Sequence, residues 1–467
     1  MVCHSVGQAI RKFQTVAANW VRCRTVRELI QALQHAEKLD KDAVTSLEQQ
    51  SRQLLSNDLR EAAMLALTLQ NFGGDGKKLL EEVKASPGDA NLDIMFRALA
   101  ECGAAEPPFP ASEAFDAQGA LEQPRQVYNF ICAACTFQKR GGQVDINRLI
   151  MRLKDMNLQE FNTIQIMQMA AGLAAIDPTI HEQVLKTLCD ELSTRKLNEV
   201  DISDLVEAMA QISKYYQHIT LINVFEETMK LHCAEHALLP HDICLVLYTL
   251  SRYRTGNTLL MDRLSVNIRR DAGSYNIEQL SRIIVALSQI GYHNKPLVAI
   301  IARMVLTIID PEMTADVQLL TNLYTGFSRF LQHKRLFDTF SAILRKEEVL
   351  ADLQVHDAVA IVQSYARVHV VDEKLFALLD AKLFTKPMNT NLSMKLLVAH
   401  GKLRYSNPRL QHALVNNINL QEINSTIDRE VSVHEKERSA ILCNIYAKGT
   451  VDSCDTSEYH VLTQRRS

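Results

Sequence analysis

The chain has 467 residues, 47% hydrophobic and 22% charged, so it can bury a sizeable apolar core and does not have the composition of a disordered protein. Glycine (16) and proline (11) are scarce and aromatic residues make up 6%, which favours helices with aliphatic side chains over a strand-and-turn protein. The net charge of −3 argues against a uniformly basic nucleic-acid binder, and no apolar run reaches the ~20 residues that span a bilayer.

Residues 1–27 are cationic and contain no carboxylate before Glu28. Val6, Ile10 and Phe13 fall on one side of a helix drawn through this segment. An amphipathic, basic and acid-free N-terminus is typical of a mitochondrial presequence. The segment therefore predicts import into the mitochondrial matrix, and the alternative is an ordinary first helix with a basic face.

Four further segments follow from the pattern of apolar residues. Residues 28–103 predict acidic N-terminal helical repeats, and residues 104–124 hold four prolines that interrupt the pattern and predict a surface loop or hinge. The main helical-repeat array is predicted over residues 125–448. Residues 449–467 lose the periodicity and become polar, which predicts a disordered tail.

A four-residue signature recurs in the main array: an apolar residue, a small one, a polar one and an apolar one. The clearest copies are Leu250-Ser251-Arg252-Tyr253, Leu287-Ser288-Gln289-Ile290 and Phe327-Ser328-Arg329-Phe330. The small residue stands at 174, 210, 251, 288, 328, 366 and 401, about every 37 residues, with fainter copies at 34, 70, 100, 135 and 443. This period predicts an all-α fold, an α-solenoid of stacked antiparallel helix pairs, in which the small side chain lets consecutive helices cross closely.

Three local motifs have the residue types of a chemical site but not its full pattern. Residues 73–78 (GGDGKK) lack the first glycine and the Ser or Thr of a phosphate-binding loop, so a polar turn is expected. Residues 232–236 (HCAEH) have the spacing of a zinc motif but no third ligand on an evident partner helix, and Cys132 and Cys135 have no second cysteine pair. We therefore predict no catalytic residue, no metal site, no cofactor and no enzymatic activity.

Positive charge is concentrated in the main array. Between residues 240 and 415 we count 21 Lys and Arg against 15 Asp and Glu, a local +6 that leaves the remainder of the chain at −9. The polar slot after the small residue becomes basic in the same segment, and stacked repeats would align the slots as a track for a polyanion. The alternative is that a solvent-facing position is simply polar. The predicted RNA-binding residues are Arg252, Arg254, Arg282, Arg329, Arg367, Lys395, Lys402 and Arg404.

With this signature and an N-terminus of presequence type, the chain resembles the organellar α-solenoid RNA-binding proteins, which include the octotricopeptide and heptatricopeptide families and the helical region of FAST-kinase-like proteins. The resemblance covers residues 140–415 and implies RNA binding along the repeats. In size and organisation the chain is also similar to the guide-RNA-associated subunits of the kinetoplastid mitochondrial RNA-editing complex, which implies binding and stabilising of guide RNA. Residues 416–467 show no strand-rich RAP-type domain, which puts a role in RNA processing in doubt.

Two functions are consistent with these features. The first is a mitochondrial protein that binds single-stranded RNA within an RNA-editing or RNA-processing complex, with phosphates on the basic residues and polar neighbours such as Asn322 near the bases or sugars. The second is a protein–protein scaffold of such a complex without direct RNA contact, since the acidic N-terminal residues could dock a basic subunit. Apolar stretches at residues 62–67 and 440–443 predict a homo- or hetero-oligomer, with residues 420–448 in the contact.

Overall fold

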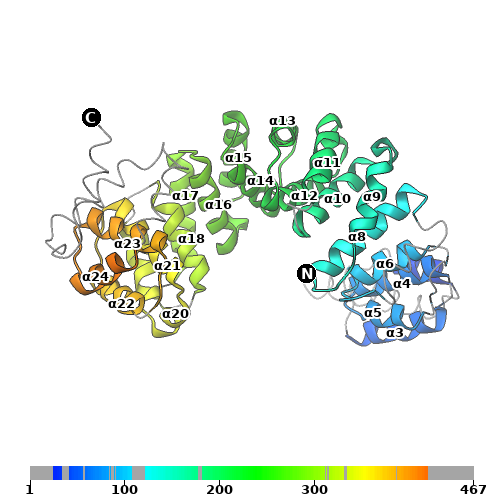
Figure 1. Ribbon diagram of the computed structural model, residues 1–467, viewed down its shortest axis with the longest axis horizontal. Coiled ribbons are helices and arrows are strands. Elements are labelled where there is room, and N and C mark those ends of the chain that lie inside the picture. Colours follow the sequence, from blue (N-terminus) through cyan, green and yellow to red (C-terminus); the bar gives the residue numbers. More distant parts are fainter. Residues whose placement is uncertain are drawn as a thin grey trace, which may run out of the picture. The chain divides into compact units, whose positions relative to one another are not determined.

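The computed structural model describes residues 25–418, except 34–40, 56–57, 84, 86–88, 90, 108–120, 177–180, 311, 313–314, 331–333 and 385. Every regular element in these residues is a helix, so the predicted all-α class is confirmed (Figure 1). The chain divides into two compact units, Met1–His232 and Cys233–Ser467.

The first unit consists of helices that follow one another along the chain. They are α2 (Val26–Leu33), α3 (Lys41–Leu54), α4 (Leu59–Asn71), α5 (Gly76–Glu81), α6 (Leu92–Glu101), α8 (Pro124–Lys139), α9 (Asn147–Asp155), α10 (Thr163–Ile176), α11 (Glu182–Thr194), α12 (Ile202–Tyr215) and α13 (Ile219–Glu235), which runs across the boundary between the units. Helices α4, α6, α8, α10 and α12 pack against one another in that order. The Pro-rich segment 104–124 thus connects α6 and α8, which are direct neighbours, and its residues 108–120 lie outside the described residues.

The second unit alternates between two layers of helices. Layer A consists of α14 (Pro240–Tyr253), α16 (Ile277–Ile290), α18 (Val317–Phe327), α21 (Val355–Val368) and α23 (Thr390–Leu403), each packed on the next. Layer B consists of α15 (Thr258–Arg270), α17 (Lys295–Ile308), α19 (Lys334–Leu344), α22 (Glu373–Phe384) and α24 (Pro408–Asn416), and each of its helices packs on the layer A helix that precedes it. The short helix α20 (Glu347–Asp352) connects α19 to α21.

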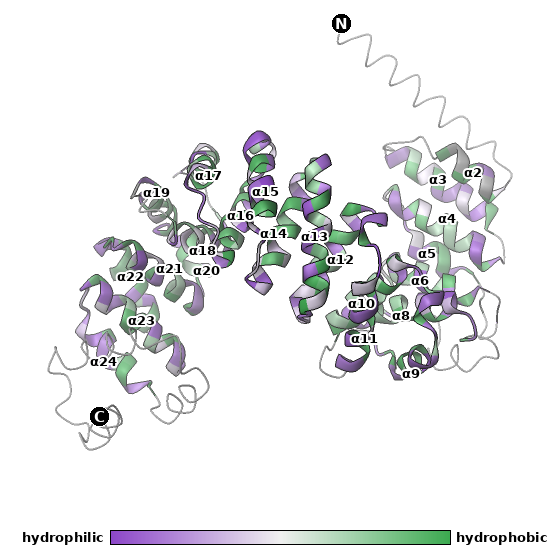
Figure 2. Ribbon diagram, turned by 90° about the horizontal axis from the view of Figure 1, so that it is seen from above, coloured by the Kyte–Doolittle hydropathy of each residue, from purple (hydrophilic) through white to green (hydrophobic). Residues whose placement is uncertain are grey.

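The sequence of α16 shows why these segments are helical. Asn276 accepts a hydrogen bond from the backbone N–H of Gln279, and the Gln279 side chain accepts one from the backbone N–H of Asn276, which satisfies two helix-end donors. Leu280, Ile284 and Leu287 recur at helical spacing and are buried. The same division into an apolar and a polar face is visible along the helices in Figure 2.

Large aromatic side chains fill the core between α18, α19 and α21. Tyr324 and Tyr365 are buried, and their hydroxyl oxygens lie 3.2 Å apart. Phe337 meets both rings edge-on, with centroid distances of 5.1 and 5.0 Å, and the Ser341 hydroxyl is hydrogen-bonded to Tyr365. Because a buried hydroxyl costs free energy unless it is hydrogen-bonded, this group of side chains favours one arrangement of the three helices.

A second kind of contact joins successive helix pairs in the first unit. The guanidinium of Arg195, just after α11, donates to the carbonyl oxygens of Phe161 and Leu158 at 2.6 and 2.7 Å. It also pairs with Glu191 at 2.8 Å. The two carbonyls belong to the short 3-10 turn that precedes α10, so one side chain ties α11 to this turn.

Several sequence predictions concern the ends of the chain. The apolar stretch at residues 62–67 lies in α4, where Ala62, Ala63 and Leu65 are buried and Met64 is 44% exposed, so most of it is covered within the unit. Residues 1–24 of the predicted presequence, the stretch at residues 440–443 and the predicted tail lie outside the described residues. Among the described residues, no helix has the length and apolar character needed to cross a membrane.

Candidate nucleic-acid interface

The small residues of the signature lie between neighbouring helices of layer A. Ser251, Ser288 and Ser328 are buried, and each hydroxyl donates to the carbonyl oxygen three residues earlier, at 2.7 to 2.9 Å. The tightest approach is at Gly326, where a Cβ atom would lie 2.7 Å from Cγ2 and 3.1 Å from the backbone carbon of Ile284. Helices α16 and α18 therefore cross with almost no side chain between their backbones.

All eight predicted RNA-binding residues are exposed. Six of them stand at or just beyond the carboxyl ends of layer A helices, and we call these six the basic row. The basic row comprises Arg252, Arg254, Arg329, Arg367, Lys402 and Arg404. The other two, Arg282 and Lys395, lie earlier in α16 and α23.

Two hydrogen bonds show that successive slots are neighbours in space. Nη1 of Arg329 donates to the carbonyl oxygen of Ser288, in the preceding repeat, at 3.4 Å. Nη1 of Arg367 donates to Oγ of Ser328 at 3.3 Å, again one repeat back. Arg329 and Arg367 therefore each contact the small position of the preceding repeat. Both acceptors are neutral, so neither of these two hydrogen bonds cancels the positive charge of its arginine.

The outward face of layer A is almost free of acidic residues. Positions two, six, nine and thirteen, counted from the first residue of each helix, share one face, and all but Val398 are exposed or half-buried. The face comprises His241, Leu245, Tyr248 and Arg252 on α14; Glu278, Arg282, Val285 and Gln289 on α16; Gln318, Asn322, Thr325 and Arg329 on α18; His356, Ala360, Gln363 and Arg367 on α21; and Asn391, Lys395, Val398 and Lys402 on α23. Glu278 is its one carboxylate, and it pairs with Arg282 at 3.7 Å. Arg282 is consequently the weakest candidate of the eight.

Helix stabilisation offers a competing explanation for part of this pattern. A cation at a carboxyl end is favourable because the last carbonyl groups of a helix carry partial negative charge. That effect acts within the last turn only. It accounts for Arg252 or Lys402 taken alone, but not for the scarcity of carboxylates over the full length of five helices.

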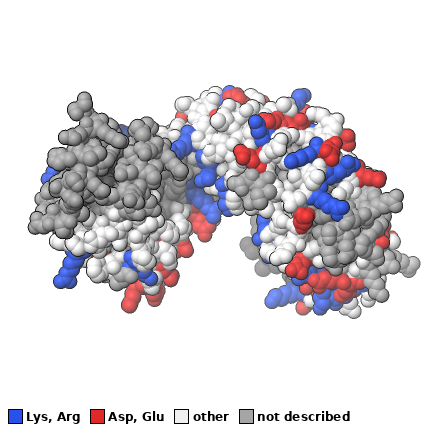
Figure 3. Space-filling view, in the orientation of Figure 1, with Lys and Arg blue, Asp and Glu red and all other residues white. Residues whose placement is uncertain are grey.

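The corresponding face of the first unit differs. On α12 it carries Asp204 and Glu207, both exposed. On α6, the Arg97 guanidinium pairs with Glu101 at 2.8 Å and lies 4.6 Å from the ring centroid of Tyr128. It also donates to Gln168 at 3.2 Å. The view in Figure 3 includes both units. Basic and acidic side chains are interspersed over much of the surface it shows, and a group of Lys and Arg atoms, drawn in blue, lies left of the centre.

Apart from the Arg97 and Glu101 pair, four residues apart on α6, nothing in the sequence pattern indicates this network, because Tyr128 and Gln168 come from two other helices. For the left-handed ends of layer A helices the sequence holds only a partial signal, the glycine at position 291. Arg254 and Arg404 end α14 and α23 in the left-handed backbone conformation, with φ of 51° and 53°. Gly291 holds the equivalent place after α16, and a glycine three residues after the small position is a readable signal for such a turn.

The structure shows the surroundings of the motifs that match a chemical site only in part. Burial raises the pKa of the Cys132 thiol to about 12 and raises that of Cys135 further, which disfavours the thiolate that metal binding or redox chemistry needs. Asp75 accepts a hydrogen bond from the backbone N–H of Lys78 at 2.9 Å and caps α5, so the glycine-rich segment is a helix-starting turn. Within the described residues, no three His, Cys, Asp or Glu side chains are grouped for a metal ion.

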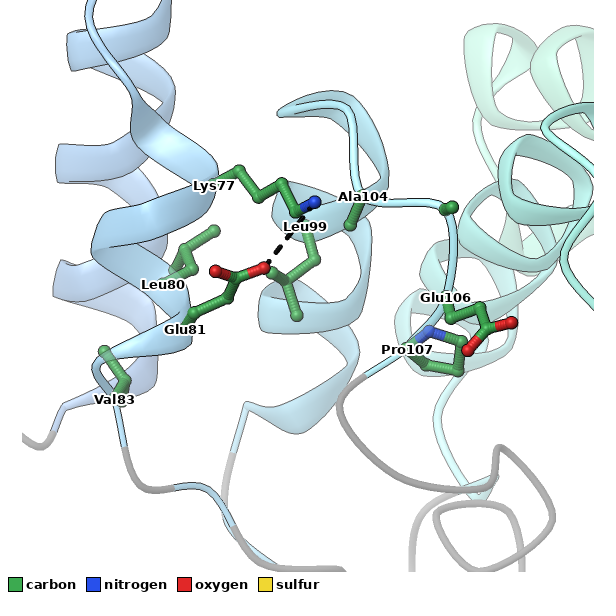
Figure 4. Close-up of a pocket in the computed structure, with 9 residues that line it drawn as sticks. Lys77, Leu80, Glu81, Val83, Leu99, Ala104, Glu106 and Pro107 are labelled. Carbon is green, nitrogen blue, oxygen red and sulfur yellow. Dashed lines mark ion pairs between the residues drawn. The ribbon is translucent and has the colours of Figure 1, made fainter.

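A shallow pocket in the first unit lies beside α5, α6 and the residues that follow α6 (Figure 4). Lys77 and Glu81 face each other there, with 3.6 Å between Nζ and Oε1. Most of the remaining lining is aliphatic, including Leu80 and Leu99, and Glu106 supplies the other charge. Its lining contains no nucleophile next to a base, so its residues do not match the requirements for catalysis.

Comparison with known proteins adds no identification. The sequence matches no protein-family model, and no curated protein is significantly similar to it. The functional argument therefore depends on the arrangement of layer A.

Proposed function

We propose that the chain binds single-stranded RNA along layer A of its second unit, as a non-catalytic subunit of a mitochondrial RNA-editing or RNA-processing complex. The observation that carries the proposal is that four residues of the basic row, Arg252, Arg329, Arg367 and Lys402, recur on a face with a single, paired carboxylate. A line of cations attracts a polyanion, because each neutralised phosphate releases condensed counterions.

The other side chains of this face fit RNA better than a simple polyanion. Asn322 and Gln363 offer amide donors and acceptors beside the slots, which suits the edges of unstacked bases. Tyr248, half-buried on α14, offers an aromatic ring for stacking. In this proposal the cations bind phosphates and position the strand, while the neutral residues contact bases or sugars.

A salt series on purified protein tests RNA binding. If all six residues of the basic row contact phosphates, a plot of log affinity against log salt for a single-stranded oligoribonucleotide should have a slope of roughly −4, at about −0.7 per contact. Filter binding or fluorescence anisotropy measures it. Undetectable affinity at low salt, or an affinity independent of salt, would rule out the proposal for the isolated chain.

Location in the mitochondrial matrix and membership in a complex are parts of the same proposal. The first is supported by the composition of residues 1–27 and the second by the apolar stretch at residues 440–443 near the end of the array. We expect light scattering to report a homo- or hetero-oligomer, with residues 420–448 required for it. A soluble 52.7 kDa monomer that ignores its candidate partners would contradict the assembly.

A scaffold without RNA contact is the second candidate function. Layer B supports it, because α22 exposes Leu378 (42%) and Phe384 (57%), and α15 exposes Leu259 and Val266. Exposed apolar side chains of this size are typical of protein–protein contacts when they lie close together. In this case the partner would bind layer B and the basic row would have no ligand.

A further inference from the structure

The ends of three layer A helices have an unusual backbone. Arg254, His369 and Arg404 each follow their helix with φ of 51°, 54° and 53°, the left-handed conformation that residues with a Cβ atom adopt reluctantly. They occupy equivalent places, three residues after the small position of the signature. Gly291 occupies this place after α16, with φ of 80°.

Helix ends of the first unit provide the comparison. Its described left-handed residues after helices are Gly73, Gly103 and Gly141, all glycines. Glycine is the expected residue there because it has no Cβ atom to clash. The second unit therefore keeps three Cβ-bearing residues, all of them basic or histidine, in a conformation for which the first unit uses glycine.

Three of the four basic slots of layer A are followed two residues later by a basic or histidine residue, and the fourth, Arg329, is followed by Leu331. Arg252 is followed by Arg254, Arg367 by His369 and Lys402 by Arg404. The neutral slot on α16 is Gln289, and its helix end is Gly291. Leu331, the counterpart after α18, lies outside the described residues. Stabilisation of the helix ends alone would favour a cation at every such end, including that of α16.

We infer that Arg254, His369 and Arg404 form a second row of phosphate contacts, beside the slots, and that their strained backbone is retained for binding. The inference rests on the proposed function and deepens it. Each helix end of α14, α21 and α23 would then hold the strand with a pair of side chains, and α16 would form a neutral interruption between them. His369, absent from the predicted set, becomes a further contact.

Glycine substitutions separate strain from binding. Arg254→Gly and Arg404→Gly relieve the left-handed strain, so each should raise Tm, by roughly 2 °C for a unit of this size. Each also removes a phosphate contact, so RNA affinity should fall about fivefold and the salt slope should lessen by about 0.7. Thermal unfolding and anisotropy on the full-length protein measure the two effects.

Gly291→Arg is the reciprocal variant. It adds strain and a cation at the interruption, where a Cβ atom meets nothing within 4 Å, so we expect a lower Tm and a higher affinity. Gly141→Arg is its matched control, since that left-handed glycine is equally uncrowded and ends a helix of the first unit. It should lower Tm to a similar extent and leave RNA affinity unchanged.

The outcomes distinguish this inference from the function on which it rests. If the wild-type chain binds RNA in a salt-dependent way but the Arg254 and Arg404 variants bind equally well, the second row is wrong, and the proposed function is reduced to the four slot residues of the basic row, Arg252, Arg329, Arg367 and Lys402. If these glycine variants lower Tm, the backbone is not strained and the inference fails on that ground. If the wild-type chain binds no RNA, both the second row and the proposed function are wrong.

Discussion

Arg329→Glu combined with Arg367→Glu is expected to weaken the binding of single-stranded RNA by at least ~100-fold. The pair occupies adjacent slots, since Arg329 contacts Ser288 and Arg367 contacts Ser328, each one repeat back. The change removes two cations and places two carboxylates in the middle of the basic row. Anisotropy at low salt measures the loss, and circular dichroism checks that the helices remain.

Arg303→Glu with Arg335→Glu is the matched control. Both arginines are exposed on layer B, on α17 and α19, so net charge changes equally while the basic row is intact. We expect their effect on RNA affinity to be small. Equal losses in the two double variants would mean that overall charge, and not the row, governs binding. Retention of RNA by the assembled complex despite the Arg329 and Arg367 changes would favour the scaffold function instead.

Gly326→Val is expected to destabilise the second unit by about 3 kcal/mol. In most helices replacing a glycine is favourable or neutral, because glycine is among the poorest helix formers. Here a Cβ atom would meet the Ile284 side chain at 2.7 Å and its backbone at 3.1 Å, so α16 and α18 must move apart. Denaturant unfolding measures the loss, and Gly326→Ala should show a smaller loss of the same sign.

Gly273→Ala is a suitable control for this experiment. Gly273 lies in the short helix between α15 and α16, and a Cβ atom there meets nothing within 4 Å. Its substitution should leave the free energy of unfolding nearly unchanged. If Gly326→Ala stabilises the protein as an ordinary helical substitution would, then α16 and α18 are not in the close contact described above.

Much of the second unit could be predicted because its information is local. The small residues fall at regular intervals and the apolar positions recur at helical spacing, so the helices and the exposed slots could both be read from the sequence. Ser288 and Ser328 were expected at a close crossing and are buried at one. The tightest point, Gly326, precedes the signature and was not singled out, because which residue touches the next helix depends on how the two helices cross.

Features that depend on distant side chains could not be predicted in this way. The pairing of Arg282 with Glu278 is an exception, since four residues separate them on one helix. Arg97 and Gln168, by contrast, are joined across three helices, and nothing in the local pattern relates them. The left-handed ends at Arg254 and Arg404 were missed for another reason: residue type favours glycine there, and these positions depart from that preference.

The anchoring of Arg329 and Arg367 on the preceding repeat has a consequence for the kinetics of the proposed binding. A free arginine side chain gives up about 2 kcal/mol of rotamer entropy when it is fixed, and part of that loss is incurred on binding if the side chain is mobile beforehand. Because the Ser288 carbonyl already holds Arg329 in the folded protein, part of this loss of rotamer entropy occurs on folding. Its remaining guanidinium donors are thus preorganised at a spacing set by helix packing, and in the proposed function this would lengthen the residence time of a strand whose phosphates match that spacing.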